Sequence, residues 1–356
     1  MSTLLLVILF VSVLILVHEW GHFYAARALG VRVDEFGFGF PPRVVSWMRG
    51  GVRYSLNALP LGGFVKIYGE QGEGEHDRAS FAGRSARVRF AILFAGIFMN
   101  ILLAWVFFSV GAAAGVPTAG DLNDISIPVS VTTVAPGSPA ERAGLRFGDQ
   151  ILELRAADGH SLRVEQLVDI RTFADAYKGE EIILAVRRGD AVREVRVTPR
   201  TSYPDGEGPL GIALDRITIL HIPWYRAPLA GAETLWRSAV ATVFGLAELV
   251  KKIFVRTAAP LEVSGPVGIY FLAQDTRVLG SSYFLEFLGI LSLNLAILNF
   301  LPIPALDGGR ILFLLVEKIK GSRVNPRVEG IIHTVGFFAL IALMILVTYK
   351  DVVKFF

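Results

Sequence analysis

The residues of this sequence with the clearest chemistry form a short motif near the N-terminus. Residues 18–22 read His-Glu-Trp-Gly-His, which is an H-E-x-x-H pattern. On a helix, His18 and His22 are one turn apart on the same face, so both imidazoles can bind one Zn²⁺. Glu19 then lies beside the metal-bound water as a general base. The motif predicts a catalytic zinc site, and the alternative is a chance match within a helix.

The position of this motif supports the metal-site interpretation. It follows an apolar stretch, Leu4 to Val17, that contains no ionisable side chain. Histidine and glutamate at membrane depth are costly and by default functional. The stretch lacks a basic leading region and continues directly into the motif. It therefore predicts a retained transmembrane helix, about Thr3 to Ala26, rather than a cleaved signal peptide.

A second polar interruption of apolar sequence supplies a candidate third ligand. Residues 299–309 read Asn-Phe-Leu-Pro-Ile-Pro-Ala-Leu-Asp-Gly-Gly. Non-helical backbone at membrane depth is tolerated only where it is buried in protein or lines a wet cavity. Asp307 is therefore predicted to complete a His, His, Asp set that leaves one zinc position open for water. The alternative is a Pro-Gly loop in which Asp307 only caps a helix before Gly308.

The elements that must position these groups are membrane helices. Of the 356 residues, 53% are hydrophobic and the mean hydropathy is +0.53, whereas residues 120–228 have the composition of a soluble segment. The composition predicts a multi-pass α-helical membrane protein with four spans of about 20 residues each. These spans cover about 3–26, 90–114, 284–301 and 331–347, and the third resumes over 310–316 after a break at Pro302 and Pro304.

The distribution of basic residues orients these spans. Lys and Arg are frequent between the first and second spans and after the third, so both loops are predicted to be cytoplasmic. Both termini and the soluble insert are then extracytoplasmic. His18 is expected inside the membrane, nearer the cytoplasmic face. Residues 229–255 form a further helical candidate, which its charges assign to the outer membrane surface rather than to a fifth span.

Net charge and cysteine content exclude other classes of protein. The formal charge is only +3, and no basic patch with interleaved aromatic residues is present, so nucleic acid is not an expected partner. Cysteine is absent, which excludes disulfide bonds and thiolate catalysis.

Two segments outside the spans predict β-structure. Residues 32–67 combine β-forming residues with Gly and Pro and indicate hairpins. Within the insert, a strand at 129–134 precedes a short Ser-capped helix at 138–145, and further strands, a helix and a hairpin follow up to residue 199. The predicted organisation is a first membrane half (1–115), a folded module (125–200), a linker with extracytoplasmic amphipathic helices (201–282) and a second membrane half (283–356).

Taken together, these motifs resemble the site-2 protease family of intramembrane zinc metalloproteases, peptidase family M50. The resemblance is closest to the bacterial regulator-of-sigma-E protease (RseP) branch. It rests on His18 to His22 and on Asn299, Pro302, Pro304 and Leu306 to Gly309. Weaker matches occur at 37–40, 61–66 and 264–268. Two departures are visible: Ala95-Gly96-Ile97 replaces the usual Ala-Gly-Pro before Asn100, and the insert has room for one PDZ module rather than two.

The resemblance implies a fold and a set of roles. The insert is expected to be a PDZ domain, which binds a peptide by strand addition or acts only as a steric cap. Residues 32–67 are expected to form a membrane-reentrant β-element that offers an edge to substrate, the alternative being a surface β-loop. Asn299 is expected to contact the substrate backbone or the developing oxyanion. Asn294 is expected either to join it or to make an interhelical hydrogen bond.

The function implied is an intramembrane zinc endopeptidase of the bacterial cytoplasmic membrane. Its expected substrates are single-span membrane proteins such as anti-sigma factors. An alternative with the same chemistry is a protease that clears remnant signal peptides. Alternatives from other classes are an inactive membrane PDZ adapter, against which the complete set of His18, Glu19, His22 and Asp307 argues, and a metal transporter. A transporter needs ionisable groups in several spans, and here the second and fourth offer only His333.

Overall fold

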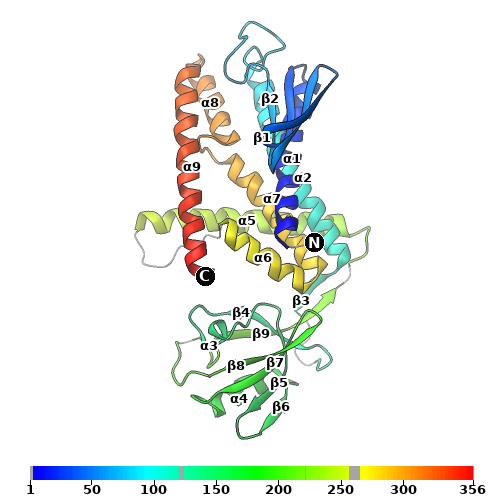
Figure 1. Ribbon diagram of the computed structural model, residues 1–356, viewed down its shortest axis with the longest axis vertical. Coiled ribbons are helices and arrows are strands. Elements are labelled where there is room, and N and C mark those ends of the chain that lie inside the picture. Colours follow the sequence, from blue (N-terminus) through cyan, green and yellow to red (C-terminus); the bar gives the residue numbers. More distant parts are fainter. Residues whose placement is uncertain (1–2, 120–123, 205, 221, 256–264, 356) are drawn as a thin grey trace. The chain divides into compact units, whose positions relative to one another are not determined.

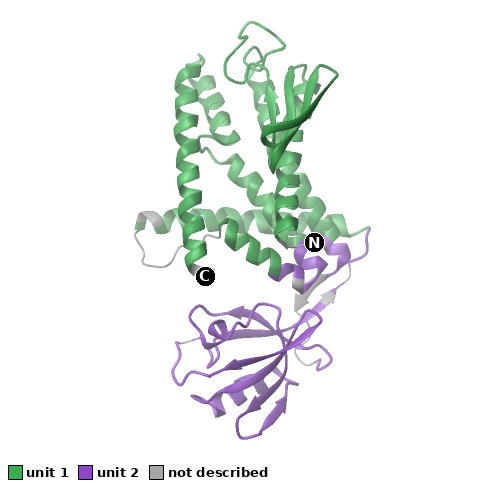
Figure 2. Cartoon of the chain, viewed as in Figure 1, with its two compact units in different colours: residues 1–110, 225–274, 285–356 green, residues 111–224, 275–284 purple. Residues whose placement is uncertain are grey.

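The chain folds into two compact units. The structure is a computed structural model that describes residues 3–119, 124–204, 206–220, 222–255 and 265–355. Unit 1 comprises residues 1–110, 225–274 and 285–356, and unit 2 comprises residues 111–224 and 275–284 (Figure 2). Unit 1 contains every candidate site residue.

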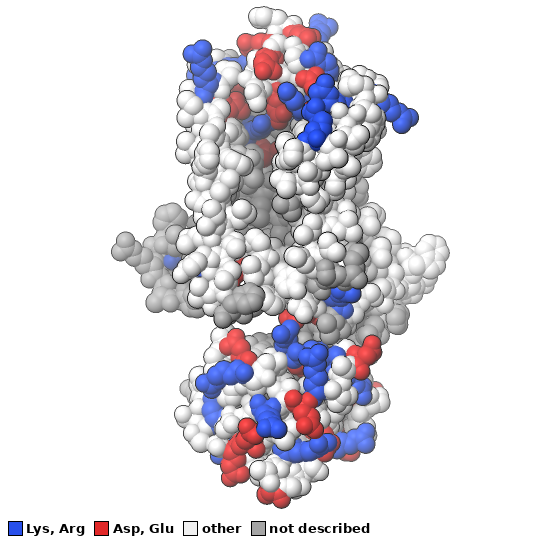
Figure 3. All heavy atoms as spheres, viewed as in Figure 1, with Lys and Arg blue, Asp and Glu red and all other residues white. Residues whose placement is uncertain are grey.

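Four helices are long and apolar enough to cross a membrane, which agrees with the four predicted spans (Figure 1). They are α1 (Thr3–Ala28), α2 (Ala86–Ala114), α7 (Ser281–Phe300) and α9 (Pro326–Phe355). Their middle sections are apolar on all sides, which suits surroundings of lipid and other helices. On the face seen in Figure 3, the charged side chains of unit 1 gather at one end, and the middle of the helices carries almost none.

The predicted break after the third span is present. Helix α7 ends at Phe300, and α8 (Asp307–Lys320) begins six residues after Leu301, at the candidate ligand itself. The loop between them contains Pro302 and Pro304, which cannot continue a helix. Helix α8 ends where Gly321 adopts the left-handed conformation, with φ 75°.

The strands predicted over residues 32–67 form a sheet of their own. Strands β1 (Val33–Arg49) and β2 (Val52–Ile67) are antiparallel and irregular in register. Phe36 pairs with Val65 on one side and with Tyr54 on the other, so the first half of β1 lies between the two halves of β2. Residues 62–67 therefore form one edge of this sheet. The sheet packs on α1 through Phe23, whose ring lies 5.2 Å from that of Phe36.

Unit 2 is built on an antiparallel sheet with a buried apolar core. Its strand order is β3-β9-β4-β5-β7-β8, and β6 pairs with β5. Helix α4 (Leu167–Ala176) contributes Ile170 and Phe173 to the core, and α3 (Pro139–Arg142) begins at the predicted Ser138 cap. The strands are β3 (Val116–Ala119), β4 (Val129–Val134), β5 (Gln150–Ala156), β6 (Ser161–Arg163), β7 (Ile182–Arg188), β8 (Ala191–Val197) and β9 (Ile212–Leu220).

The sheet of unit 2 continues beyond residue 200, where the sequence suggested that the module ends. Strand β9 pairs with β4 along Val129–Val134, and it pairs on its other side with β3. The expected linker at 203–209, of which the structure describes all but residue 205, therefore precedes a strand of the same sheet. The sequence did not reveal this because long-range strand pairing has no local signature.

Two further helices precede α7. Helix α5 (Ala227–Val255) covers the amphipathic candidate at 229–255, and α6 (Pro266–Leu279) follows it in the described part of the chain. Helix α5 exposes large apolar side chains, among them Trp236 and Phe244. It also contacts α2 within unit 1, where Trp105 Nε1 donates a hydrogen bond of 2.9 Å to Pro228 O of α5.

Candidate metal centre

Three side chains from opposite ends of the chain converge in unit 1. His18 Nε2 lies 3.0 Å and His22 Nε2 lies 3.2 Å from Asp307 Oδ2. The two Nε2 atoms are 3.1 Å apart. Both histidines are buried, and the Asp307 side chain is 17% exposed. Within the described residues, these three form the one group of acidic and histidine side chains close enough to hold a metal ion.

The donor set fits a zinc ion. Asp307 Oδ2 is buried and receives no hydrogen bond, and both Nε2 atoms point at it. Ligands about 2.0–2.1 Å from a tetrahedral zinc stand roughly 3.3 Å from one another, close to the separations found here. Two nitrogens and one oxygen are also the ligand types that catalytic zinc sites use when a fourth position stays open.

The second nitrogen of His22 fixes its tautomer. His22 Nδ1 lies 2.9 Å from the carbonyl oxygen of Ile92 on α2. A carbonyl oxygen can only accept, so Nδ1 carries the proton and donates it. The lone pair of Nε2 is therefore directed at the cluster, which is the form that binds metal.

The same argument assigns a role to Asn100. Its Nδ2 lies 3.4 Å from His18 Nδ1, and its Oδ1 is buried without a hydrogen-bond partner. A His18 that binds metal through Nε2 carries its proton on Nδ1 and needs an acceptor there. A half-turn of the carboxamide brings Oδ1 to this proton, so that Oδ1 accepts a hydrogen bond from His18 Nδ1. Ser292 also donates to the Asn100 carbonyl oxygen at 2.8 Å, which ties α7 to this turn of α2.

Two glycines allow α1 and α2 to approach closely at the cluster. A Cβ on Gly96 would lie 2.3 Å from His22 Nε2 and 2.9 Å from His18 Cε1. A Cβ on Gly21 would lie 2.4 Å from the carbonyl oxygen of Ala95. Any larger residue at Gly96 would therefore enter the space that the two imidazoles occupy.

The loop before α8 positions Asp307, the first residue of that helix. The two glycines that follow Asp307 explain how this loop can pack so tightly against α8. A Cβ on Gly308 would lie 2.1 Å from the carbonyl oxygen of Leu301. A Cβ on Gly309 would lie 2.5 Å from the carbonyl oxygen of Ile303. The loop backbone therefore lies directly against the first turn of α8, and only glycine leaves room for it.

Glu19 is tied to the β1–β2 sheet. The backbone N–H of Val65 donates a hydrogen bond of 3.0 Å to Glu19 Oε2. Val65 lies in the edge segment of β2, so this N–H is directed outward from the sheet and at the carboxylate. This hydrogen bond occupies one of the two carboxylate oxygens of Glu19.

The two predicted asparagines have different surroundings. Asn294 Oδ1 accepts a hydrogen bond of 3.1 Å from Thr242 of α5, which is the interhelical contact considered as its alternative role. Asn299 is half-buried near the end of α7, and its side chain has no hydrogen-bond partner in the described part of the chain. The geometry leaves Asn299 free to contact a substrate and favours a structural role for Asn294.

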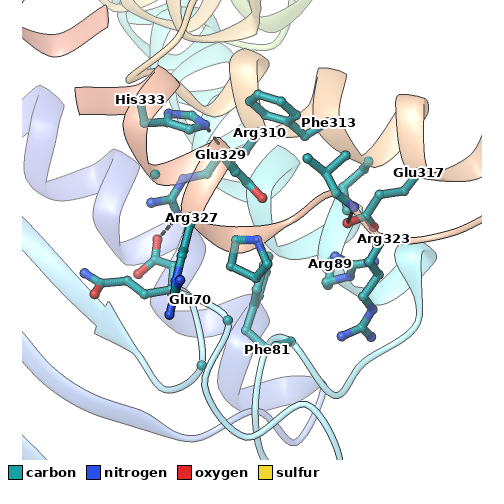
Figure 4. Close-up of a pocket in the computed structure, with 18 of the residues that line it drawn as sticks. Glu70, Phe81, Arg89, Arg310, Phe313, Glu317, Arg323, Arg327, Glu329 and His333 are labelled. Atoms are coloured by element: carbon teal, nitrogen blue, oxygen red, sulfur yellow. Dashed lines mark hydrogen bonds and ion pairs between the residues drawn. The ribbon is translucent and has the colours of Figure 1, made fainter. Parts of the chain in front are cut away.

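A separate charged pocket of about 770 Å³ lies between residues 69–82, α8 and α9 (Figure 4). Arg310, one turn after Asp307, forms an ion pair there with Glu70. Arg89 of α2 pairs with Glu317 of α8 at 2.6 Å, and both side chains are about nine-tenths buried. These pairs join α8, which carries Asp307, to the half of the chain that carries the two histidines.

Sequence reasoning named the candidate ligands and the candidate base but missed the groups that support them. Asn100 had a signal, because it is a polar residue inside an apolar span, and Gly96 had a weaker one as a glycine in the same span. The backbone groups of Ile92 and Val65 had none, because every residue carries them. Only the fold brings those two groups to His22 and Glu19.

Comparisons with known proteins show a family and several relatives that align along most of the chain. The family model described as peptidase family M50 matches residues 6–343. A protein of Clostridium acetobutylicum is 33% identical over 353 residues, which are 98% of this chain and 97% of that protein. Two further relatives are named zinc metalloprotease RasP, one from Shouchella clausii and one from Oceanobacillus iheyensis. Each is 28% identical to this chain, over 443 and 448 aligned positions respectively, and each alignment covers 100% of both proteins.

Proposed function

The chain belongs to peptidase family M50, the site-2 protease family of membrane zinc metalloproteases, and we propose that it cleaves single-span membrane proteins within the bilayer. His18, His22 and Asp307 are the proposed zinc ligands. The observation that carries the proposal is the convergence of these three groups, 3.0–3.2 Å apart, from helices α1 and α8. A zinc ion held by these residues would act as a Lewis acid that polarises the scissile carbonyl and lowers the pKa of the attacking water.

Glu19 is the proposed general base. It follows a ligand directly in α1, so its carboxylate lies beside the metal position. It takes the proton of the attacking water and returns it to the leaving amine. The Val65 N–H holds one carboxylate oxygen, which fixes the orientation of the other. Asn299, whose side chain has no partner within the described residues, is the proposed contact for the substrate backbone or the oxyanion.

The sheet edge beside Glu19 gives the proposed substrate its conformation. A helical segment exposes no peptide bond to attack, because its backbone groups bond to one another. An extended segment can add to a sheet edge through backbone hydrogen bonds. The edge at residues 62–67 suits this purpose, since Val65 in that edge already contacts the catalytic carboxylate. The proposed membrane-reentrant role of β1 and β2 follows from this contact.

Unit 2 is proposed to be a single PDZ-type domain on the outer side of the membrane. Its antiparallel sheet with α4 packed on one side supports a PDZ-type fold. The basic loops that flank the spans support a cytoplasmic position for the β1–β2 side of unit 1. The proposed location is the bacterial cytoplasmic membrane, with the metal centre toward the cytoplasmic face.

The experiment that tests the substrate class compares membranes that contain wild-type protein or Glu19→Gln. Quantitative mass spectrometry of membrane peptides should reveal single-span proteins that accumulate uncut in the Glu19→Gln sample. Accumulating anti-sigma factors support a signalling protease, and accumulating signal-peptide remnants support the clearance alternative. Accumulation of soluble or periplasmic proteins alone contradicts intramembrane cleavage.

A further inference from the structure

His333 contacts the loop that leads to Asp307, and the proposed mechanism gives it no role. This histidine lies on α9, and its Nδ1 accepts a hydrogen bond of 2.9 Å from the backbone N–H of Ala305. Its ring also lies 5.6 Å from the ring of Phe313 on α8. The imidazole therefore contacts both the loop and the helix on either side of Asp307. Figure 4 shows it at one end of the charged pocket, near Arg310 and Glu329.

The residue that donates this hydrogen bond has an unusual backbone conformation. Ala305 has φ 76°, and no other non-glycine residue in the described part of the chain has a positive φ. L-residues with a Cβ rarely adopt this region, because the Cβ crowds the following carbonyl group. The conformation turns the chain from Pro304 into α8, which begins two residues later at Asp307. An outside contact must therefore stabilise the turn that aims the carboxylate.

A second contact from α9 supports the same turn. A Cβ on Gly336 would lie 2.4 Å from Pro304 Cβ and 2.9 Å from the Pro304 carbonyl oxygen. Gly336 is about one turn after His333, so both residues lie on the same face of α9. That face holds Pro304 by close packing and Ala305 by a hydrogen bond.

We infer that His333 is a positioning residue for the metal centre: by accepting the Ala305 N–H, it holds the left-handed turn that directs Asp307 at His18 and His22. The inference rests on the proposed role of Asp307 as a ligand. Since Nδ1 is the acceptor, the ring proton is on Nε2. That atom lies 4.0 Å from Glu329 Oε1. His333 is thus oriented for support of the loop, and it does not join the metal ligands.

Four variants of the full-length protein in detergent or lipid test this role. His333→Leu removes the acceptor, and His333→Asn keeps an acceptor oxygen close to the position of Nδ1. Ala305→Gly relieves the left-handed conformation, because glycine adopts it freely. The double variant His333→Leu/Ala305→Gly asks whether relief of the turn replaces the hydrogen bond. Thr348→Val is the matched control, since within the described residues the Thr348 hydroxyl on α9 bonds only to its own helix, at Met344 O.

The readouts are zinc affinity, by competition with a chelator, and the visible absorption spectrum of the cobalt-substituted protein, which reports ligand geometry. His333→Leu should weaken zinc binding about 10-fold or more, as loss of a group that orients a metal ligand does. His333→Asn and the double variant should recover most of that affinity and the wild-type cobalt spectrum. Thr348→Val should match the wild type in both.

Three results would overturn the inference. The first is wild-type affinity in His333→Leu. The second is a loss of zinc affinity in His333→Leu that persists in the double variant His333→Leu/Ala305→Gly. The loss would then come from altered packing of α9 and not from the turn. The third is the absence of zinc binding in the wild-type protein. That result would contradict the proposed function as well, and the wild-type measurement alone separates it from the first two results.

Discussion

His18 Nε2 lies 3.0 Å from Asp307 Oδ2, although the two residues belong to helices at opposite ends of the chain. Neither half of the chain holds the complete set of proposed ligands. The metal centre therefore depends on the contacts that join α1 and α2 to α8, and variants at those contacts should affect metal binding without touching a ligand.

Asn100 should control the affinity of the site through His18. Asn100→Leu removes the only side-chain oxygen that can accept the His18 Nδ1 proton in the described residues. Zinc affinity should fall by about 10- to 100-fold, as measured by chelator competition. Asn100→Asp keeps an acceptor oxygen and should retain most of the affinity. Equal affinity in Asn100→Leu and wild type would rule out this role.

Gly96 should be needed for the metal site and not for the fold of α2. In Gly96→Ala the new methyl group would lie 2.3 Å from His22 Nε2, so the imidazole must move and zinc content should drop. Gly245→Ala on α5 is the matched control, since a Cβ there meets no atom within 4 Å. In a helix interior, alanine is about 1 kcal/mol more favourable than glycine. The control should therefore keep its zinc and melt at the same or a higher temperature.

Removal of one partner of the Arg89–Glu317 ion pair should destabilise the fold strongly, whereas replacement of both partners by apolar residues should destabilise it little. Both side chains are about nine-tenths buried, so Glu317→Gln leaves Arg89 as a charge without its partner. Loss of one partner of such a pair costs about 3–5 kcal/mol, whereas apolar replacement of both is often neutral. We expect a large fall in melting temperature for Glu317→Gln and substantial recovery in Arg89→Met/Glu317→Leu. Additive losses in the double variant would show that the two residues do not act as a pair.

The sequence identified the residues of the candidate site more completely than the contacts that position them. His18, Glu19 and His22 follow from helical spacing, and Asp307 follows from a carboxylate beside a break in an apolar span. The four candidate spans and the strands at 32–67 are present for similar local reasons. Strand β9 and the Val65 contact to Glu19 depend on pairing between distant segments, which no local pattern encodes.

Unit 2 should regulate access and take no part in the reaction. Among the described residues, the candidate metal cluster lies entirely in unit 1 and includes no residue of unit 2. A clean deletion must remove residues 116–220 and insert a flexible linker, because a deletion that stops at residue 200 leaves β9 without β4. The deleted protein should still cut a substrate with a short outer tail and should cut bulky substrates more readily. Loss of cleavage of the short substrate, in a folded and zinc-loaded protein, would make unit 2 part of the working enzyme.

The most direct test of the account measures zinc content and cleavage in the same preparations of wild type, Glu19→Gln and His22→Ala. The wild type should hold about one zinc per chain and cut a single-span substrate in lipid. Glu19→Gln should keep the zinc and lose the cleavage, because the ligands remain and the base does not. His22→Ala should lose both. Near wild-type cleavage by Glu19→Gln, or full zinc content in His22→Ala, would contradict the assignment of this site.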